Sequence, residues 1–97
     1  MKKTYSKTGT SCQVTFELPA EINAKTVALC GDFNEWETST HLMTQRKDGS
    51  YSRTISLKPG KEYRFRYLID GERWENDWSA DKYISNEFAT EDSVVVV

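Results

Sequence analysis

The sequence predicts an all-β protein, an immunoglobulin-like β-sandwich of about six to eight antiparallel strands. Several short segments alternate apolar and polar residues with a period of two, as strands with one buried face do. Glycine, proline and aspartate separate these segments and favour turns between them. No segment keeps a helical period over a useful length, so we expect less than about 10% helix, well below the usual content of globular proteins. Short strands divided by turns in this way are typical of a sandwich.

Six segments are expected to form strands. In the first of them Cys12, Val14, Phe16 and Leu18 share one face, and Pro19 ends the alternation. The longest alternating run places four apolar side chains on one face and a mostly polar set on the other. The expected strands span residues 12–18, 26–30, 51–57, 62–69, 72–76 and 93–97.

Turn residues mark the connections between these strands. Asp-Gly pairs at 48–49 and 70–71 are typical of hairpins, and the Pro-Gly pair at 59–60 ends another strand. Residues 78–92 form the longest irregular stretch of the chain. We expect its large apolar side chains to hold it against the core; these are Trp78, Tyr83, Ile84 and Phe88.

The 97 residues fit one domain with a modest core. We divide the chain into a flexible N-terminal tail, residues 1–10, and a β-sandwich domain, residues 11–97. The tail is polar, with Tyr5 as its only aromatic residue, so it is expected to be a loose end or a weak edge strand.

The balance of charge argues against two classes of partner. Thirteen basic and fifteen acidic residues give a net charge of −2, which provides no field to attract nucleic acid or an anionic membrane. No run of about 20 apolar residues could span a membrane, and the N-terminus has no apolar signal-peptide core. We therefore expect a cytoplasmic protein that binds neither nucleic acid nor membranes.

The two cysteines, Cys12 and Cys30, are expected to be reduced and buried as small hydrophobic residues. A disulfide is the alternative, should their strands be neighbours. Together with His41, the only histidine, they lie too far apart in sequence to suggest a zinc site. His41 is expected to be an exposed loop residue, and the sequence predicts no cofactor.

The loop that follows the strand 26–30 is the most distinctive segment. Gly31 and Asp32 end the strand, because both tolerate backbone conformations that a strand does not use. Two large aromatic residues follow within the same loop. We expect Phe33 to anchor the loop in the core and Trp36 to be offered to solvent.

Residues 27–36 (Val-Ala-Leu-Cys-Gly-Asp-Phe-Asn-Glu-Trp) resemble a family of small glucan-associated β-sandwich domains. These are the isoamylase-type early-set domains, or carbohydrate-binding module family 48. They occur at the N-termini of glycogen branching and debranching enzymes, and as the glycogen-binding domain of the AMP-activated kinase β subunit. Two further segments match the family pattern in order and spacing. One is the aromatic-basic strand with its Asp-Gly turn and tryptophan, residues 63–74, followed by Asp77; the other is Asn86 to Ala89.

The resemblance implies a platform for α-1,4-linked glucose made of two tryptophans that flank a basic residue. The platform positions match Trp36 and Trp74, the basic position falls on Arg66, and a further threonine matches Thr90. The chain has Asp92 where the family usually has asparagine. It also departs in having alanine at 89, where glycine is common, arginine rather than the more frequent lysine at 66, and one more residue in the turn before the second tryptophan than the kinase-type domains have.

Elementary chemistry supports such a platform. A pyranose ring presents C–H bonds on its faces, which suit a flat, electron-rich indole. The hydroxyl groups at its rim need hydrogen-bonding partners, which Arg66, Asn86 and Asp92 could supply. Covering roughly 100 Å² of apolar face yields about 2.5 kcal/mol per ring before association costs. We therefore expect weak binding, with a dissociation constant of roughly 10 µM to 1 mM.

The candidate carbohydrate-binding residues are thus Trp36, Trp74, Arg66, Asn86, Thr90 and Asp92, and the predicted ligand is glycogen, starch or a maltooligosaccharide. The alternative for each tryptophan is packing in the core, which we favour for Trp78, and the alternative for Arg66 is solvation or a cross-strand ion pair. If Trp36 or Trp74 is buried, the sugar hypothesis is weakened.

Catalysis is not expected. Glycoside hydrolysis needs two carboxylates across a cleft, this family places catalysis in a separate barrel of about 250 residues, and no nucleophile or phosphate-binding signature is present. The alternative function is a protein-interaction or accessory module of the same fold, which docks a glycogen-metabolising enzyme or self-associates without binding sugar. A further alternative is a fragment of a branching or debranching enzyme.

Overall fold

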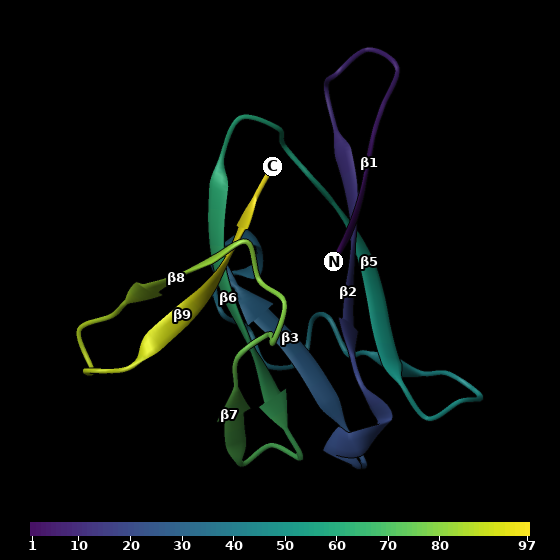
Figure 1. Ribbon diagram of the computed structural model, residues 1–97, viewed down its shortest axis with the longest axis vertical. Helices are drawn as coiled ribbons and strands as arrows, with labels where there is room; N and C mark the ends of the chain where they lie inside the picture. Colours follow the sequence, from purple (N-terminus) through teal and green to yellow (C-terminus); the bar gives the residue numbers. More distant parts are fainter.

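The computed structural model describes residues 1–97 and shows two antiparallel sheets packed face to face (Figure 1). This confirms the predicted β-sandwich. Helical structure is limited to two 3-10 turns, η1 (Ala20–Ile22) and η2 (Asp32–Asn34). The nine strands are β1 (Lys2–Tyr5), β2 (Cys12–Leu18), β3 (Val27–Gly31), β4 (Thr44–Gln45), β5 (Tyr51–Leu57), β6 (Glu62–Ile69), β7 (Arg73–Glu75), β8 (Lys82–Ser85) and β9 (Glu91–Val96).

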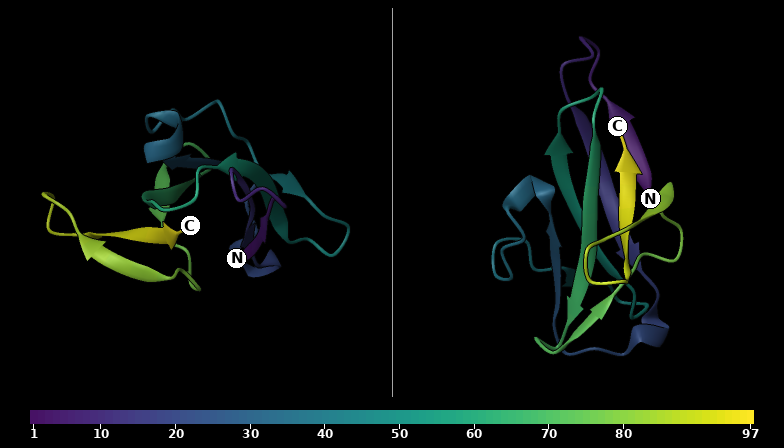
Figure 2. Two further views of the ribbon diagram at one scale, coloured as in Figure 1. Left: turned by 90° about the horizontal axis from the view of Figure 1, so that it is seen from above. Right: turned by 90° about the vertical axis from the view of Figure 1, so that its left-hand side faces the viewer.

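The four-stranded sheet has the order β1-β2-β5-β4, and the five-stranded sheet has the order β3-β6-β9-β8, with β7 also paired to β6. Strand β9 pairs with the first half of β6, and β7 pairs with its last three residues. The hairpin formed by β8 and β9 projects from the body of the sandwich (Figure 2). Strand β6 therefore pairs with three strands, β3, β7 and β9, and lies in the middle of the sheet.

The core lies between the two sheets and follows from alternation along the strands. In β2 the residues at 12, 14, 16 and 18 are buried and their neighbours are not, as the sequence predicts. From the facing sheet β6 contributes Phe65, Tyr67 and Ile69. Phe16 and Phe65 meet edge to face, with ring centroids 4.9 Å apart, a favoured aromatic geometry.

The observed strand bounds match the sequence-based expectation for β2, β5 and β6, and differ by one or two residues for β3, β7 and β9. The short strand β4 was not predicted. Residues 2–5, where the sequence is compatible with a loose end or a weak edge strand, form strand β1 on the edge of the four-stranded sheet. Two expectations for residues 78–92 were wrong. The stretch contains strand β8, and its aromatic residues do not hold it down, since Trp78 is 56% exposed and Phe88 is 76% exposed.

Both cysteines are free and buried, which confirms the expectation. Cys12 belongs to the core between the sheets. Cys30 is paired in register with Arg66, so its side chain lies on the outer face of the five-stranded sheet. Burial raises the pKa of the Cys30 thiol to about 11. No helix in the structure has the length and apolar character to cross a membrane.

Candidate functional site

A single groove of about 980 Å³ lies on the outer face of the five-stranded sheet. Its walls come from the β3–β4 loop, the middle of β6, strand β7 and the hairpin between β8 and β9. All six residues singled out from the sequence line this groove. The lining residues are Asp32, Trp36, Arg64, Arg66, Trp74, Ser85, Asn86, Glu87, Phe88, Thr90 and Asp92.

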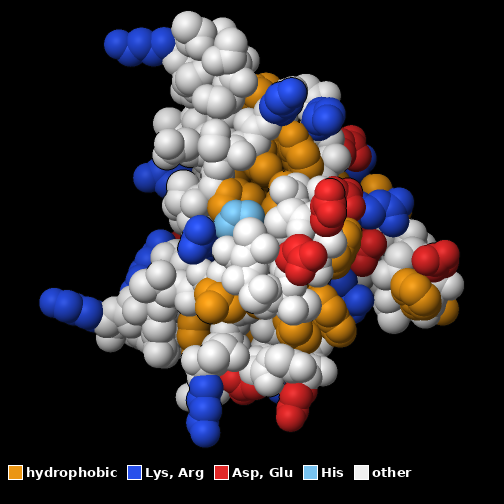
Figure 3. All heavy atoms as spheres, turned by 180° about the vertical axis from the view of Figure 1, so that it is seen from behind, with side chains coloured by type: hydrophobic (Ala, Val, Ile, Leu, Met, Phe, Trp, Pro, Cys, Tyr) orange, Lys and Arg blue, Asp and Glu red, His pale blue; other side chains and the backbone are white.

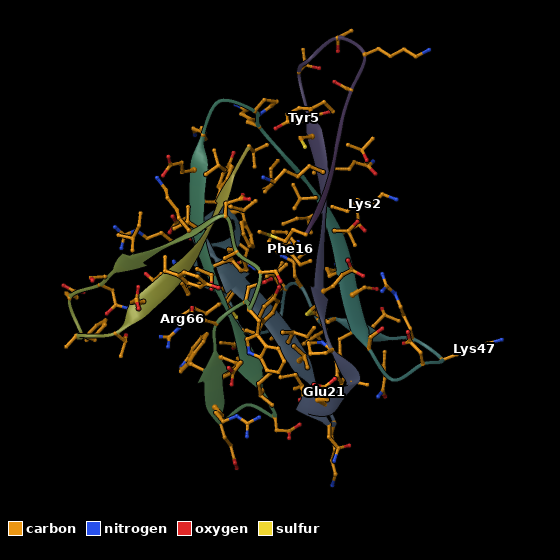
Figure 4. All side chains as sticks on the ribbon, viewed as in Figure 1. Lys2, Tyr5, Phe16, Glu21, Lys47 and Arg66 are labelled. Carbon is orange, nitrogen blue, oxygen red and sulfur yellow. The ribbon has the colours of Figure 1, made fainter.

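Strand register explains why these side chains gather here. Because β6 alternates, Phe65, Tyr67 and Ile69 enter the core while Arg64 and Arg66 point to the outer face. Figure 4 shows Phe16 between the sheets and Arg66 on the other side of β6, beside β7. Trp74 pairs in register with Leu68 and so shares this outer face. The groove and the core are thus opposite sides of one sheet.

The two groove tryptophans form an angled pair. The ring centroids of Trp36 and Trp74 lie 6.3 Å apart, and their planes are inclined by 64°. Trp74 is 41% exposed and Trp36 is half-buried, so neither belongs to the hydrophobic core. The surface that they make is bent rather than flat.

Arg66 lies at the edge of this pair. Its guanidinium carbon is 5.9 Å from the centroid of the Trp74 ring, a distance at which a cation and an indole attract each other. Arg66 makes no ion pair, and its buried Nε has no hydrogen-bond partner. The other groove arginine, Arg64, does have a carboxylate nearby, with Nη1 3.5 Å from Asp92 Oδ2. Arg66 is therefore the groove cation whose donors are available to a ligand.

The amide of Asn86 organises the hairpin that forms the far wall. Its Oδ1 accepts hydrogen bonds from the backbone N–H of Phe88 at 2.9 Å and of Thr90 at 3.2 Å, and from the Thr90 hydroxyl at 3.0 Å. Its Nδ2 donates to Asp92 Oδ1 at 3.1 Å. Asp92 is only 7% exposed, so it supports the groove from below. In the structure Asn86 and Asp92 shape the wall, whereas the Thr90 oxygen keeps acceptor capacity.

Phe88 is a groove residue that the sequence did not reveal. The expectation that it packs against the core was wrong, because its ring lies at the tip of the hairpin and largely in solvent. The next residue, Ala89, has a φ of 62°, which turns the chain sharply at this point. A large apolar side chain among the polar residues of a tight turn is the signal that could have identified it.

The β3–β4 loop is fastened to the sheet by side chains of its first residues. Gly31 has an extended φ of −173°, which any residue can adopt. Glycine is required here because there is no space for a side chain: a Cβ would lie 2.5 Å from the Arg64 carbonyl oxygen and 2.8 Å from the Phe65 Cβ. Phe33 packs on Phe16 with centroids 5.6 Å apart, which confirms its role as the anchor. The loop therefore starts from a rigid base.

His41 and Asn34 close the same loop. Asn34 accepts the Gly31 N–H at 3.0 Å and donates through Nδ2 to the Leu29 carbonyl at 2.9 Å. The same Nδ2 lies 2.9 Å from His41 Nδ1, which must therefore accept. Figure 3 shows the histidine at the surface with hydrophobic side chains beside it. It is half-buried rather than exposed as expected, and burial, followed by the charge of Arg53, lowers its pKa.

The structure contains no cluster of three or more histidine, cysteine, aspartate or glutamate residues that could hold a metal ion. The groove instead offers two indoles, a phenyl ring, a free guanidinium group and several oxygen acceptors. This composition suits an uncharged ligand with apolar faces and a hydroxylated rim.

The fold and the groove define a β-sandwich with an aromatic site on its surface. Comparison with family models gives a match over residues 9–91 to the glycogen recognition site of AMP-activated protein kinase. Because the match covers most of the chain, the protein belongs to this family of carbohydrate-binding modules. No individual curated protein matches the chain.

Proposed function

We propose that the protein binds α-1,4-linked glucan without catalysis, through the groove lined by Trp36, Trp74 and Arg66. The observation that carries the proposal is the meeting of these three side chains on one exposed face of a domain of the glycogen-recognition family. Glycogen, starch and maltooligosaccharides share the chemistry that the groove would recognise. A cytoplasmic location, where glycogen would be met, is part of the proposal.

The two indoles would stack on sugar faces and Arg66 would donate to the hydroxyl groups at the rim. An indole face excludes water from the C–H bonds of the sugar, while the guanidinium group offers several donors in one plane. Thr90 Oγ1 supplies an acceptor from the opposite wall. Phe88 extends the apolar surface beyond the tryptophan pair.

The inclination of the rings favours an α-linked over a β-linked chain. A 1,4-α-glucan coils, so successive sugar rings turn relative to one another, whereas a 1,4-β-glucan runs flat. Rings inclined by 64° can follow a coiling chain but cannot both lie on a flat one. Maltoheptaose should therefore bind and cellohexaose should not.

As a first test, tryptophan variants are titrated with maltoheptaose and their binding is measured by calorimetry. Trp36→Ala and Trp74→Ala should each weaken binding by about 1–3 kcal/mol, a range borrowed from aromatic side chains that stack on nucleic-acid bases. Arg66→Ala should cost less, about 1 kcal/mol, because an exposed hydrogen bond contributes little net energy. Trp78→Ala is the matched control, since Trp78 is also exposed but lies outside the groove.

Thermal melts of the same variants separate binding from stability. None of the variants should lose the roughly 3–5 kcal/mol that removal of a core tryptophan costs. Full affinity in both groove variants would contradict the proposal. Retention of a folded protein with no affinity for any α-glucan would instead favour the alternative, a module that docks a glycogen-metabolising enzyme or self-associates.

A further inference from the structure

The Asp32 carboxylate connects one wall of the groove to strand β6. Its Oδ1 accepts a hydrogen bond from the indole Nε1 of Trp36 at 3.0 Å. Its Oδ2 accepts a hydrogen bond from the backbone N–H of Arg64 at 2.9 Å. Each oxygen thus has a different donor, and the two donors lie 28 residues apart in the chain.

The backbone donor is available because β3 ends at this point. The pairing of β3 with β6 stops at Gly31 and Phe65. The next pair would join Asp32 to Arg64, but the backbone of Asp32 has already entered the 3-10 turn η2. The Asp32 side chain therefore takes over the hydrogen bond that a longer β3 would have made, and this fixes the position of its carboxylate relative to β6.

The backbone of Trp36 is held as firmly as its indole. Glu35 and Trp36 have φ values of 55° and 61°, a left-handed conformation that is unfavourable for residues with a side chain. The Trp36 N–H donates to the Gly31 carbonyl at 2.9 Å. Trp36 is thus fixed at its backbone N–H by Gly31 and at its indole nitrogen by Asp32. These contacts hold the residue in an unfavourable backbone conformation.

We propose that Asp32 is a positioning residue that sets the inclination of Trp36 against Trp74 and so prepares the groove for a coiled glucan. The inference rests on the proposed function and extends it to the choice of ligand shape. An indole that is already fixed loses less rotational freedom when sugar binds, so affinity is gained without a direct contact. Two acceptor oxygens are needed, because Asp32 serves two donors.

The test combines Asp32→Ala and Asp32→Asn with NMR spectra of the three tryptophan indole N–H groups. In Asp32→Ala the Trp36 indole resonance should shift and its hydrogen exchange should become faster, while the resonance of Trp78, which lies outside the groove, changes little. Maltoheptaose affinity should fall about 2- to 12-fold, the cost of restoring freedom to one large side chain. Asp32→Asn keeps one acceptor and should give an intermediate loss. Glu37→Ala, another exposed acidic residue of the same loop, is the matched control and should change nothing.

A double-mutant cycle separates positioning from direct contact with sugar. Trp36→Phe keeps an aromatic ring but has no N–H for Asp32 to hold. In that background Asp32→Ala should weaken maltoheptaose binding no further. An equal loss in both backgrounds would show that the carboxylate acts otherwise than through the Trp36 indole, either by touching the ligand or through its hydrogen bond with the Arg64 N–H, and would overturn the proposal.

The NMR measurement is made without sugar, so it remains decisive if the proposed function fails. An unchanged Trp36 indole resonance in Asp32→Ala would overturn the positioning role by itself. A shifted resonance in a protein that binds no α-glucan would support the positioning role of Asp32 and refute only the glucan function.

Discussion

The site loop depends on single polar side chains that take the place of backbone pairing. Asn34 joins the strand end at Leu29 and Gly31 to His41, and Asp32 joins β6 to the indole of Trp36. Short amide and carboxylate side chains can do this because they reach nearby backbone groups without leaving the turn. The loop that carries Trp36 is thus held by side-chain hydrogen bonds as well as by the packing of Phe33 on the core.

A pH dependence follows from the Asn34–His41 contact. The folded-state pKa of His41 is lowered from 6.5, first by burial and then by the charge of Arg53. Below about pH 6.5 the unfolded chain therefore binds more protons at this residue than the folded protein does, and stability falls as the pH drops. Protonation would also place a second donor opposite Asn34 Nδ2.

Urea unfolding between pH 8 and pH 5, for the native sequence and for His41→Gln, measures this effect. The unfolding free energy of the native sequence minus that of His41→Gln should be constant above about pH 7. It should decrease as the pH falls through 6.5. The carboxylates of Asp48, Asp70 and Asp81 all have lowered pKa values, mainly through hydrogen bonds that they accept, and so titrate below this range. Parallel curves for the two proteins would rule out a contribution from His41.

The sequence could identify Trp36, Trp74 and Arg66 but not Asp32 or Phe88 as groove residues. The first three stand in motifs with a fixed local spacing, next to turns that the sequence itself marks. Asp32 gains its role from Arg64, a partner 32 positions away, so it depends on strand register. Register is set by the whole sheet and cannot be read from either segment alone.

Among the elements, periodicity failed to predict β8 and the two-residue strand β4. Strand β8 has four residues, and only Ile84 among them is even half-buried, so no apolar face repeats along it. The longer strands β2 and β6 each pack one full face on the core and were predicted to the residue. Alternation marks strands whose one face is buried, and a short projecting hairpin strand has no such face.

The loop between β7 and β8 is held by a buried polar network rather than by its aromatic residues. Asp77 is 3% exposed; its Oδ2 accepts the Tyr67 hydroxyl at 2.6 Å and its Oδ1 accepts the Ser79 N–H at 2.7 Å. The Asp77 N–H donates in turn to Ser93 Oγ in β9. Burial, followed by the charge of Asp77, raises the pKa of Tyr67 well above its ordinary value, so the hydroxyl remains a donor.

Removing that donor should destabilise the protein while leaving the groove intact. Tyr67→Phe leaves a buried carboxyl group with one donor fewer, at a cost of about 1–3 kcal/mol in unfolding free energy. Tyr63→Phe is the matched control, because the Tyr63 hydroxyl donates to the Lys58 carbonyl near solvent and should contribute less than about 1 kcal/mol. Urea unfolding measures both, and equal losses would mean that burial of Asp77 is energetically unimportant. Maltoheptaose affinity should be unchanged in both variants.

At the scale of the whole molecule, the five-stranded sheet separates the hydrophobic core from the groove. Its inner face contributes Phe65, Tyr67 and Ile69 to the core, and its outer face carries the groove. Substitution of an exposed outer-face residue such as Trp74 should therefore cost little folding free energy. The fold class was predictable because it follows from the inner faces, which obey a simple period.

Recognition and folding remain linked through mass action, and Cys12 can report this. Its side chain is fully buried in the core, so a water-soluble thiol reagent reaches it only when the protein opens. A ligand that binds only the folded protein lowers the open population by the factor 1 + [L]/Kd. In a Cys30→Ala background, under moderate urea where whole-molecule unfolding dominates, maltoheptaose at ten times its dissociation constant should slow labelling about tenfold.

Cellohexaose should leave the labelling rate of Cys12 unchanged, because a flat chain does not fit the inclined tryptophans. In Trp74→Ala the protection at the same maltoheptaose concentration should largely disappear, although Cys12 itself is untouched. Labelling that maltoheptaose does not slow would mean that the folded sandwich does not bind α-glucan, and rapid labelling without urea would mean that Cys12 is not part of a cooperative core.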